Sequence, residues 1–172
     1  LCRRRRRQYA HGVNGLKVLI VYDSRTGNTE QMAFAVAKGI EKNGLEAVLR
    51  KVEEASVDEL PQAQALILGS PVYYGLPTGR IKEFIDESVK YHGKLTNLVG
   101  GAFCSAGGTH TGSETTILAL LESMLIHGMI IQGYPHGNHY GPAAVGAPDD
   151  KALEHCEKLA ERVANLVKKL NQ

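Results

Sequence analysis

Three hydroxyl side chains lie close together in a short polar stretch that follows an apolar run. The stretch is Asp23-Ser24-Arg25-Thr26-Gly27-Asn28-Thr29, and the run before it is Val18–Tyr22. The run predicts a buried strand, and the apolar pattern after Thr29 predicts a helix. The first N–H groups of a helix have no intrahelical acceptor and carry the positive end of the helix dipole, so this turn suits a phosphate. An ordinary capped turn is the alternative, because the same residue types cap helices that bind nothing.

The stretch matches neither of two common nucleotide-binding motifs. It contains no lysine and lacks the G-x-x-x-x-G-K-[ST] pattern of the P-loop. It also lacks the G-x-G-x-x-G turn that binds the pyrophosphate of a dinucleotide. We therefore expect a pocket for one terminal phosphate monoester, with O–H groups donated by Ser24, Thr26 and Thr29.

Strand and helix patterns alternate along the rest of the chain. The expected strands are Lys17–Tyr22, Glu46–Val52, Ala65–Gly69, Leu98–Cys104 and Met129–Gln132. The expected helices are Thr29–Lys42, Gly79–Tyr91, Ser113–His127 and Asp150–Leu170, with one further helical turn near Val57–Pro61. Short apolar strands that alternate with helices predict an α/β three-layer sandwich, in which helices cover both faces of a five-stranded parallel sheet.

Four polar loops follow the expected strands. They are Ser24–Thr29, Gly69–Pro77, Ser105–Gly112 and the sixteen-residue segment Gly133–Pro148. In a doubly wound parallel sheet, ligands bind beyond the carboxyl ends of the strands. We therefore expect all four loops to meet at one edge of the sheet and to form a binding site there.

Two of these loops carry groups suited to an aromatic ligand. Tyr73 and Tyr74 could stack on a planar ring, although covering the sheet edge is the simpler role. Gly107, Gly108 and Gly112 would let backbone N–H groups approach a ring that gains negative charge on reduction. A plain strand–helix connection is the alternative for these glycines.

The composition is that of an ordinary globular domain. The 172 residues are 43% hydrophobic and 22% charged, which fits one domain over residues 16–172. Arg3–Arg7 supply five of the positive charges, so the net charge of +2 falls to −3 without them. We interpret residues 1–15 as a disordered basic arm. An RNA-binding arm is the alternative, but the acidic remainder makes nucleic acid an unexpected partner.

The cysteine spacing and the hydropathy of the chain indicate the cellular compartment. Cys2, Cys104 and Cys156 share no metal-binding spacing, so we expect no metal or iron–sulfur site and buried thiols in a reducing cytoplasm. No stretch approaches the roughly 20 apolar residues of a membrane span. We therefore expect a cytoplasmic protein.

Taken together, the motifs resemble those of the WrbA-like NAD(P)H:quinone oxidoreductases of the flavodoxin superfamily. The resemblance runs from Lys17 to Asn171. The segments that carry it are Ser24–Thr29, Gly69-Ser70-Pro71 with Tyr74-Gly75, Phe103-x-Ser105 with Gly107 and Glu114, and His127-Gly128-Met129. It implies a flavodoxin-like fold with strand order 2-1-3-4-5, a non-covalently bound FMN, and two-electron reduction of a quinone by NAD(P)H.

The resemblance also implies which residues contact FMN. The cofactor-binding residues are Ser24, Arg25, Thr26, Gly27, Asn28, Thr29, Pro71, Val72, Tyr73, Tyr74, Gly75, Ser105, Ala106, Gly107, Gly108, Thr109, His110, Thr111 and His127. His127 is expected near both the flavin and the quinone, and no residue is expected to be a covalent catalyst. His139–Gly141 is similar to the family's Tyr-Gly in the loop after the fifth strand. The alternative for His110 and His127 is a loop histidine and a partly buried helix-end histidine.

The chain departs from the WrbA-like pattern in three places. The usual insertion after the second strand is missing, Tyr73 stands where the family has arginine, and the family's GTGGGQE run reads GGTHTGSE. A flavodoxin-type electron carrier that docks to redox partner proteins is therefore the alternative function. The charge of −3 weakly favours the enzyme, because such carriers are often strongly acidic around the flavin.

The expected helix Ser113–His127 is apolar around most of its circumference. A helix of this kind is usually buried on more than one side, either against its own sheet or against another subunit. The family resemblance favours a subunit, so we expect a homo-oligomer whose neighbouring chain helps to enclose the flavin.

Overall fold

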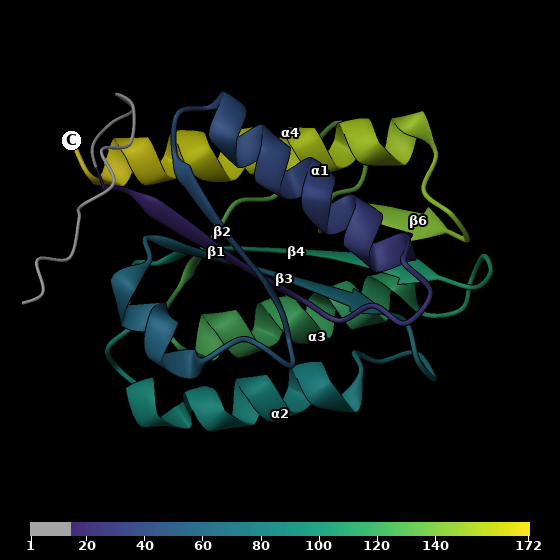
Figure 1. Ribbon diagram of the computed structural model, residues 1–172, viewed down its shortest axis with the longest axis horizontal. Coiled ribbons are helices and arrows are strands. Elements are labelled where there is room, and N and C mark those ends of the chain that lie inside the picture. Colours follow the sequence, from purple (N-terminus) through teal and green to yellow (C-terminus); the bar gives the residue numbers. More distant parts are fainter. Residues whose placement is uncertain (1–14) are drawn as a thin grey trace, which may run out of the picture.

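A parallel sheet forms the middle layer of the computed structural model, which describes residues 15–172 (Figure 1). The predicted basic arm, apart from Gly15, lies outside the described residues. The strands are β1 (Lys17–Tyr22), β2 (Glu46–Lys51), β3 (Ala65–Pro71), β4 (Val99–Ala106), β5 (Ile130–Ile131) and β6 (Ala143–Val145). Their order is β2-β1-β3-β4-β5, and β6 also pairs with β4. The predicted strand order is therefore confirmed.

The central strands are buried on both faces, which explains their continuous apolar sequences. Along β1, Val18 and Ile20 pack into the cluster on one face of the sheet. Leu19 and Val21 point to the opposite face and pack into a second cluster. All four side chains are almost completely shielded from solvent, so β1 fixes both halves of the core.

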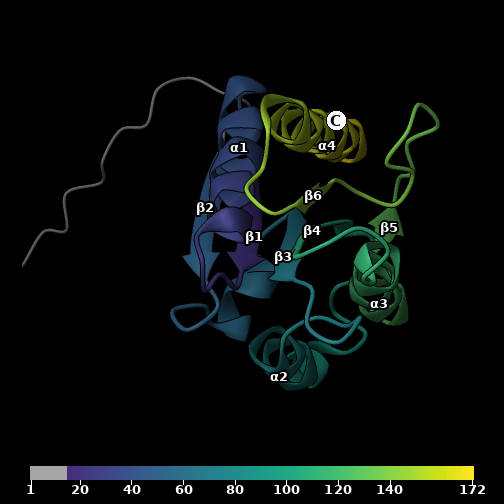
Figure 2. The same ribbon diagram turned by 90° about the vertical axis from the view of Figure 1, so that its right-hand side faces the viewer.

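Helices cover both faces of the sheet (Figure 2). The face with α1 (Asn28–Lys42) and α4 (Asp150–Leu170) is opposite the face with α2 (Gly79–Glu87) and α3 (Ser113–Ile126). Where α1 approaches α4, a Cβ atom on Gly39 would lie 2.6 Å from Cβ of Ala160. Only glycine permits this close approach.

One detail of the predicted helices on the second face is wrong. The helix expected over Gly79–Tyr91 ends at Glu87, and Ser88–Tyr91 continue as the 3-10 helix η2. Within this chain, Met124 in the last turn of α3 is buried, whereas Leu125 is 57% and Ile126 is 72% exposed. The sheet takes up only one side of α3, so the apolar residues on the other side remain at the surface.

The position next to β4 in the sheet is filled in two pieces. β5 pairs with Val99 and Gly100 at the start of β4, while β6 pairs with Cys104–Ala106 at its end. Between the two pieces, residues 132–142 leave the sheet and return to it (Figure 2). The prediction that Gly133–Pro148 forms a single loop beyond the strand ends is therefore wrong. The backbone pairing of β6 with β4 divides it, because a parallel partner satisfies the N–H and C=O groups of β4.

The excursion of residues 132–142 packs against α4. The guanidinium carbon of Arg162 lies 4.4 Å from the centre of the Tyr134 ring. The side chains of Asn138 and His155 share a hydrogen bond of 2.5 Å. These contacts place most of the excursion beside α4, away from the carboxyl ends of β1 and β3.

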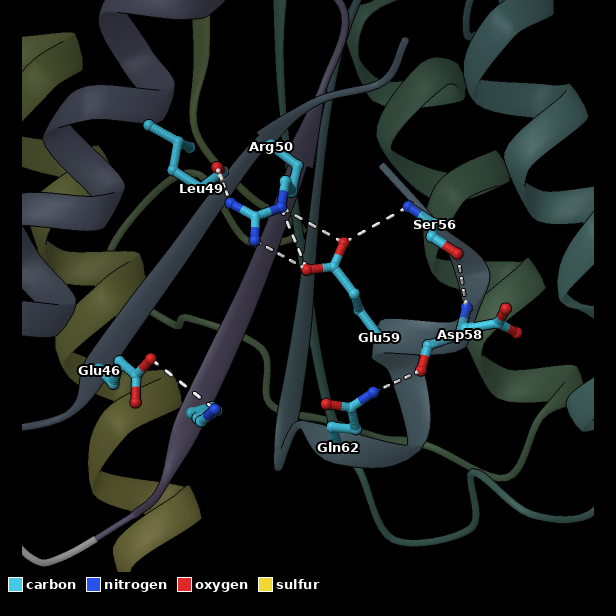
Figure 3. Close-up of polar contacts among 8 residues, drawn as sticks. Glu46, Leu49, Arg50, Ser56, Asp58, Glu59 and Gln62 are labelled. Atoms are coloured by element: carbon cyan, nitrogen blue, oxygen red, sulfur yellow. Dashed lines mark hydrogen bonds and ion pairs between the residues drawn. The ribbon is translucent and has the colours of Figure 1, made fainter. Parts of the chain in front are cut away.

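The connection between β2 and β3 is short and is closed by the 3-10 helix η1 (Val57–Gln62), as Figure 3 shows. The Ser56 hydroxyl accepts a hydrogen bond from the Asp58 N–H at 3.2 Å, and the Glu59 carboxylate accepts one from the Ser56 N–H at 3.4 Å. The same carboxylate lies 2.9 Å from Nη2 of Arg50 on β2. This capping box and ion pair hold η1 against the sheet.

Both cysteines of the described part of the chain are buried and unpaired. Burial raises the pKa of the Cys104 and Cys156 thiols to about 12, so neither is a reactive thiolate at neutral pH. None of the helices within residues 15–172 has the length and apolar character needed to cross a bilayer.

Candidate functional site

Three of the predicted loops meet at the carboxyl ends of β1, β3 and β4, on the right-hand side of Figure 1. The guanidinium carbon of Arg25 lies 5.1 Å from the centre of the Tyr73 ring. The hydroxyl of Thr115 donates a hydrogen bond to the Gly75 carbonyl at 2.8 Å. The structure thus brings together the segments 24–29, 71–75 and 105–111, as the sequence predicts.

The first loop ends in a helix start that has free hydrogen-bond donors. The N-cap residue of α1 is Gly27, which has no side chain to cap the helix and has a φ of 88°. The Ser24 hydroxyl oxygen accepts hydrogen bonds from the N–H groups of Gly27 at 3.2 Å and Glu30 at 3.3 Å. The N–H groups of Asn28 and Thr29 have no intrahelical acceptor, so they remain available to an anion.

The four α-helices of the described chain differ at their N-termini. The helices α2 and α4 are capped by the side chains of Thr78 and Asp149. In contrast, α1 and α3 begin at Gly27 and Gly112, both in the left-handed conformation and both without a side chain that could cap the helix from the N-cap position. The uncapped helices are the two that follow the first and third loops of the site, where backbone N–H donors would meet a ligand.

Tyr22, at the end of β1, holds the first turn of α1 in place. Its hydroxyl donates a hydrogen bond to the Glu30 carboxylate at 2.9 Å. Burial, followed by this bond and the negative charge of Glu30, raises the pKa of Tyr22 to about 12. Tyr22 therefore keeps its proton and its donor role across the physiological pH range.

The third hydroxyl of the first loop is engaged inside the protein. The Thr29 and Ser105 hydroxyl oxygens lie 2.8 Å apart, and both residues are buried. Two hydroxyls that share one hydrogen bond still have one O–H left to donate. The pair therefore joins the first loop to the end of β4 and keeps one donor for a ligand.

The second loop is a tight turn that exposes aromatic rings. Tyr73 and Leu76 exchange backbone hydrogen bonds of 3.0 and 3.1 Å. The two central residues, Tyr74 and Gly75, have φ values of 51° and 77°, the signs required by a type I′ turn. Tyr74 is fully exposed and Tyr73 is 38% exposed. Tyr74 therefore covers no part of the sheet edge, which removes the simpler alternative for that residue.

The third loop touches the second at a glycine. A Cβ atom on Gly112 would lie 2.5 Å from Cα of Gly75, and the φ of Gly112 is 108°. Gly107 instead faces open space, and His110 is exposed with a φ of 57°. Gly112 is required for the close contact between the loops, while Gly107 leaves its backbone open to a ligand.

The prediction that His127 lies near the other site residues is wrong within this chain. The 14 residues of α3 extend about 21 Å from the carboxyl edge toward the opposite edge, and His127 caps the far end. Gly128 there accepts a hydrogen bond from the Asn97 N–H, just before β4 begins. Nε2 of His127 lies 2.8 Å from the Ser88 hydroxyl. Burial, and to a lesser extent the nearby His92, lower the pKa of His127.

Sequence reasoning assigned no role to a charged pair beside the first loop. Asp23 is completely buried, and both of its carboxylate oxygens lack a hydrogen-bond partner among residues 15–172. Nη1 of Arg80 lies 3.7 Å from the nearer oxygen, and Arg80 also pairs with Glu53. An aspartate at the end of an apolar strand was the available signal for Asp23. Arg80 lies 57 positions further along the chain, and no sequence pattern marks it as the partner of Asp23.

A surface hollow of about 550 Å³ lies along β2, away from the converging loops. Its charged groups are already paired (Figure 3). Nζ of Lys17 lies 3.8 Å from Oε1 of Glu46, and Nη2 of Arg50 lies 2.9 Å from Oε1 of Glu59. None of the residues predicted for the site lines it. The converging loops therefore remain the candidate site.

Comparison with known proteins identifies the family to which the chain belongs. A sequence model of the family described as Flavodoxin matches residues 20–125, which include all three converging loops. An Archaeoglobus fulgidus protein named NAD(P)H dehydrogenase (quinone) is 31% identical over 188 residues, covering 90% of this chain and 98% of that protein. An Aquifex aeolicus protein named flavodoxin is 34% identical over 160 residues, covering 88% of this chain and 86% of that protein.

A solved structure shows the same fold. The flavodoxin, WrbA-like protein from Agrobacterium tumefaciens has a TM-score of 0.78 and 29% sequence identity to this chain. The match covers 90% of this chain and 98% of the other. The resemblance inferred from the motifs is thereby confirmed at the level of the family and the fold.

Proposed function

Because the chain belongs to the flavodoxin family, we propose that the three converging loops bind FMN without a covalent bond. The observation that carries the proposal is the start of α1. Its glycine N-cap leaves the N–H groups of Asn28 and Thr29 free beside the hydroxyls of Ser24 and Thr26. This donor set fits one phosphate monoester.

The remaining loops supply groups that suit the ring of a flavin. Tyr73 and Tyr74 present aromatic surface at the same edge, where they would bind the apolar part of the ring and exclude water from it. The backbone of Ser105–Thr111 would approach the polar end of the ring, where N–H donors stabilise negative charge. FMN is favoured over FAD because no G-x-G-x-x-G pyrophosphate turn is present in the sequence.

The activity that we propose is the two-electron reduction of a quinone by NAD(P)H. Bound FMN would supply the redox chemistry, by accepting hydride from the nicotinamide and passing the electrons to the quinone. The protein would position the two substrates in turn on the exposed side of the site, against Tyr73, Tyr74 and Leu76. The name of the Archaeoglobus relative, with 98% of its length covered, supports this activity.

An electron carrier is the second candidate, and the Aquifex relative named flavodoxin favours it. Steady-state oxidation of NADH and of NADPH with benzoquinone as acceptor separates the two functions. We expect repeated turnover with at least one nucleotide, at a rate far above that of free FMN. A holoprotein that accepts electrons only from a reductase protein would contradict the enzyme and support the carrier.

We also propose that the chain forms a homodimer or a larger homo-oligomer. Leu125 and Ile126 supply exposed apolar surface on the last turn of α3, which a second subunit would cover. Light scattering at micromolar concentration measures the mass directly. A monomeric mass together with full quinone reductase activity would contradict this proposal.

A further inference from the structure

A buried negative charge lies directly before the loop proposed to hold the FMN phosphate. Asp23 has no exposed surface, and the next residue, Ser24, begins that loop. Within the described chain, neither carboxylate oxygen of Asp23 accepts a hydrogen bond. A charge taken out of water without hydrogen bonds is screened poorly, so its field reaches the neighbouring anion site.

Among residues 15–172, the one cation paired with Asp23 is in an unusual place for a cation. Arg80 lies in the first turn of α2, where the helix dipole disfavours positive charge and favours acids. Its Nη1 atom lies 3.7 Å from Oδ1 of Asp23, and the same atom contacts Glu53. Half of the Arg80 side chain is exposed, so packing does not account for its position. Its surroundings point to charge compensation.

We propose that Arg80 compensates the charge of Asp23 and thereby allows the loop Ser24–Thr29 to accept a doubly charged phosphate. This inference rests on the proposed FMN site. Arg80 then acts on the phosphate through the charge of Asp23 and does not contact the phosphate itself. The proposal concerns only the charged end of the cofactor, because riboflavin has the same ring and no phosphate.

The test measures the ratio of the riboflavin and FMN dissociation constants at pH 8 for the apoprotein and its variants. Flavin fluorescence follows each titration. Arg80→Gln should lower this ratio about tenfold, and Asp23→Asn should raise it by a similar factor, as expected for one unit charge in a partly buried setting. The double variant should return to within about threefold of the wild type, because the two charge changes cancel.

A matched control removes the same charge from a neighbouring position on α2. Lys82 is exposed, and its ammonium group lies 2.6 Å from Asp86, one turn away on the same helix. Lys82→Gln should leave the ratio unchanged. Arg80→Lys, which keeps the charge, should retain most of the wild-type ratio.

Three results would overturn the inference. The first is an equal ratio for Arg80→Gln and Lys82→Gln. The second is a double variant as weak as Arg80→Gln alone, which would show that Arg80 binds the phosphate directly. The third is an unchanged ratio in Asp23→Asn, which decides the matter even if Arg80→Gln does not fold. Absence of FMN binding by the wild type would instead contradict the proposed function.

Discussion

The hydroxyl groups of Thr29 and Ser105 lie 2.8 Å apart, although the two residues are 76 positions apart in the chain. Thr29 belongs to the first turn of α1, and Ser105 lies near the carboxyl end of β4. This hydrogen bond ties the proposed phosphate loop to the strand that leads into the third loop. The bond thus fixes the position of one loop relative to the other.

The bond between these hydroxyls predicts different effects at two threonines of one loop. Thr29→Val should lower the free energy of unfolding by about 1–3 kcal/mol, because it leaves the buried Ser105 hydroxyl without its partner. Thr26 is exposed, so Thr26→Val should change the free energy of unfolding by less than about 0.5 kcal/mol and should weaken only the binding of FMN. Urea unfolding of the two apo variants measures the difference. Equal stabilities would show that the hydrogen bond does not contribute.

The contact between the second and third loops predicts a strong effect of one methyl group. Gly112→Ala should separate the loops and weaken FMN binding at least tenfold. The new Cβ would lie 2.5 Å from Cα of Gly75, and the φ of 108° at Gly112 is unfavourable for alanine. Gly93→Ala is the matched control, because Gly93 also has a positive φ, of 77°, its Cβ would meet open space, and it lies outside the proposed site. Fluorescence titration compares the two variants. If both bound FMN as the wild type does, the close contact would not be needed.

The sequence predicted the sheet because its signals are local. The apolar run of β1 and the apolar pattern of the helix that follows it each report on their own neighbourhood. The pairing of Ala143–Val145 with β4 could not be predicted in this way. Three small apolar residues carry no periodicity, and a backbone partner elsewhere in the chain makes them a strand.

The candidate site was predicted in part for the same reason. The three loops follow strand ends, so their convergence follows from the parallel topology. His127 was misplaced because a motif gives no direction along a helix, whereas α3 carries this residue to the opposite edge. The contact of Asp23 with Arg80 is tertiary, and no local pattern in the sequence predicts it.

His127 should make stability depend on pH. Because the Ser88 hydroxyl donates to the Ile85 carbonyl at 2.6 Å, Nε2 of His127 donates to Ser88, and the buried Nδ1 has no partner within the described residues. Burial lowers the pKa of His127 in the folded state, so the unfolded chain binds more protons as the pH falls. Its contribution to stability is complete above the unfolded pKa of about 6.5 and is lost below it, with a slope of at most about 1.4 kcal/mol per pH unit.

Thermal unfolding between pH 5 and pH 8 checks this effect. His127→Gln keeps an N–H group for Ser88 and cannot titrate, so its melting temperature should fall less steeply with acid than that of the wild type. Parallel curves for the two proteins would contradict the prediction. The comparison cancels the contribution of the carboxylates, which both proteins share.

Tyr74 should trade stability for function. A positive φ is unfavourable for tyrosine and common for asparagine in type I′ turns, so Tyr74→Asn should raise the free energy of unfolding by about 0.5–1 kcal/mol. The same change removes a fully exposed ring from the site and should lower quinone turnover. Tyr140→Asn, at an exposed tyrosine outside the positive-φ residues, should bring no gain in stability. A destabilised Tyr74→Asn variant would contradict the backbone argument.

Titration of the apoprotein with FMN, FAD and riboflavin tests the central claim most directly. We expect one equivalent of FMN to bind, with an affinity at least about tenfold above that of riboflavin, because the uncapped start of α1 holds the phosphate. FAD should bind more weakly than FMN, since the site offers donors for one terminal monoester. Equal affinities for FMN and riboflavin, or preferential binding of FAD, would contradict the assignment of Ser24–Thr29 as a phosphate loop.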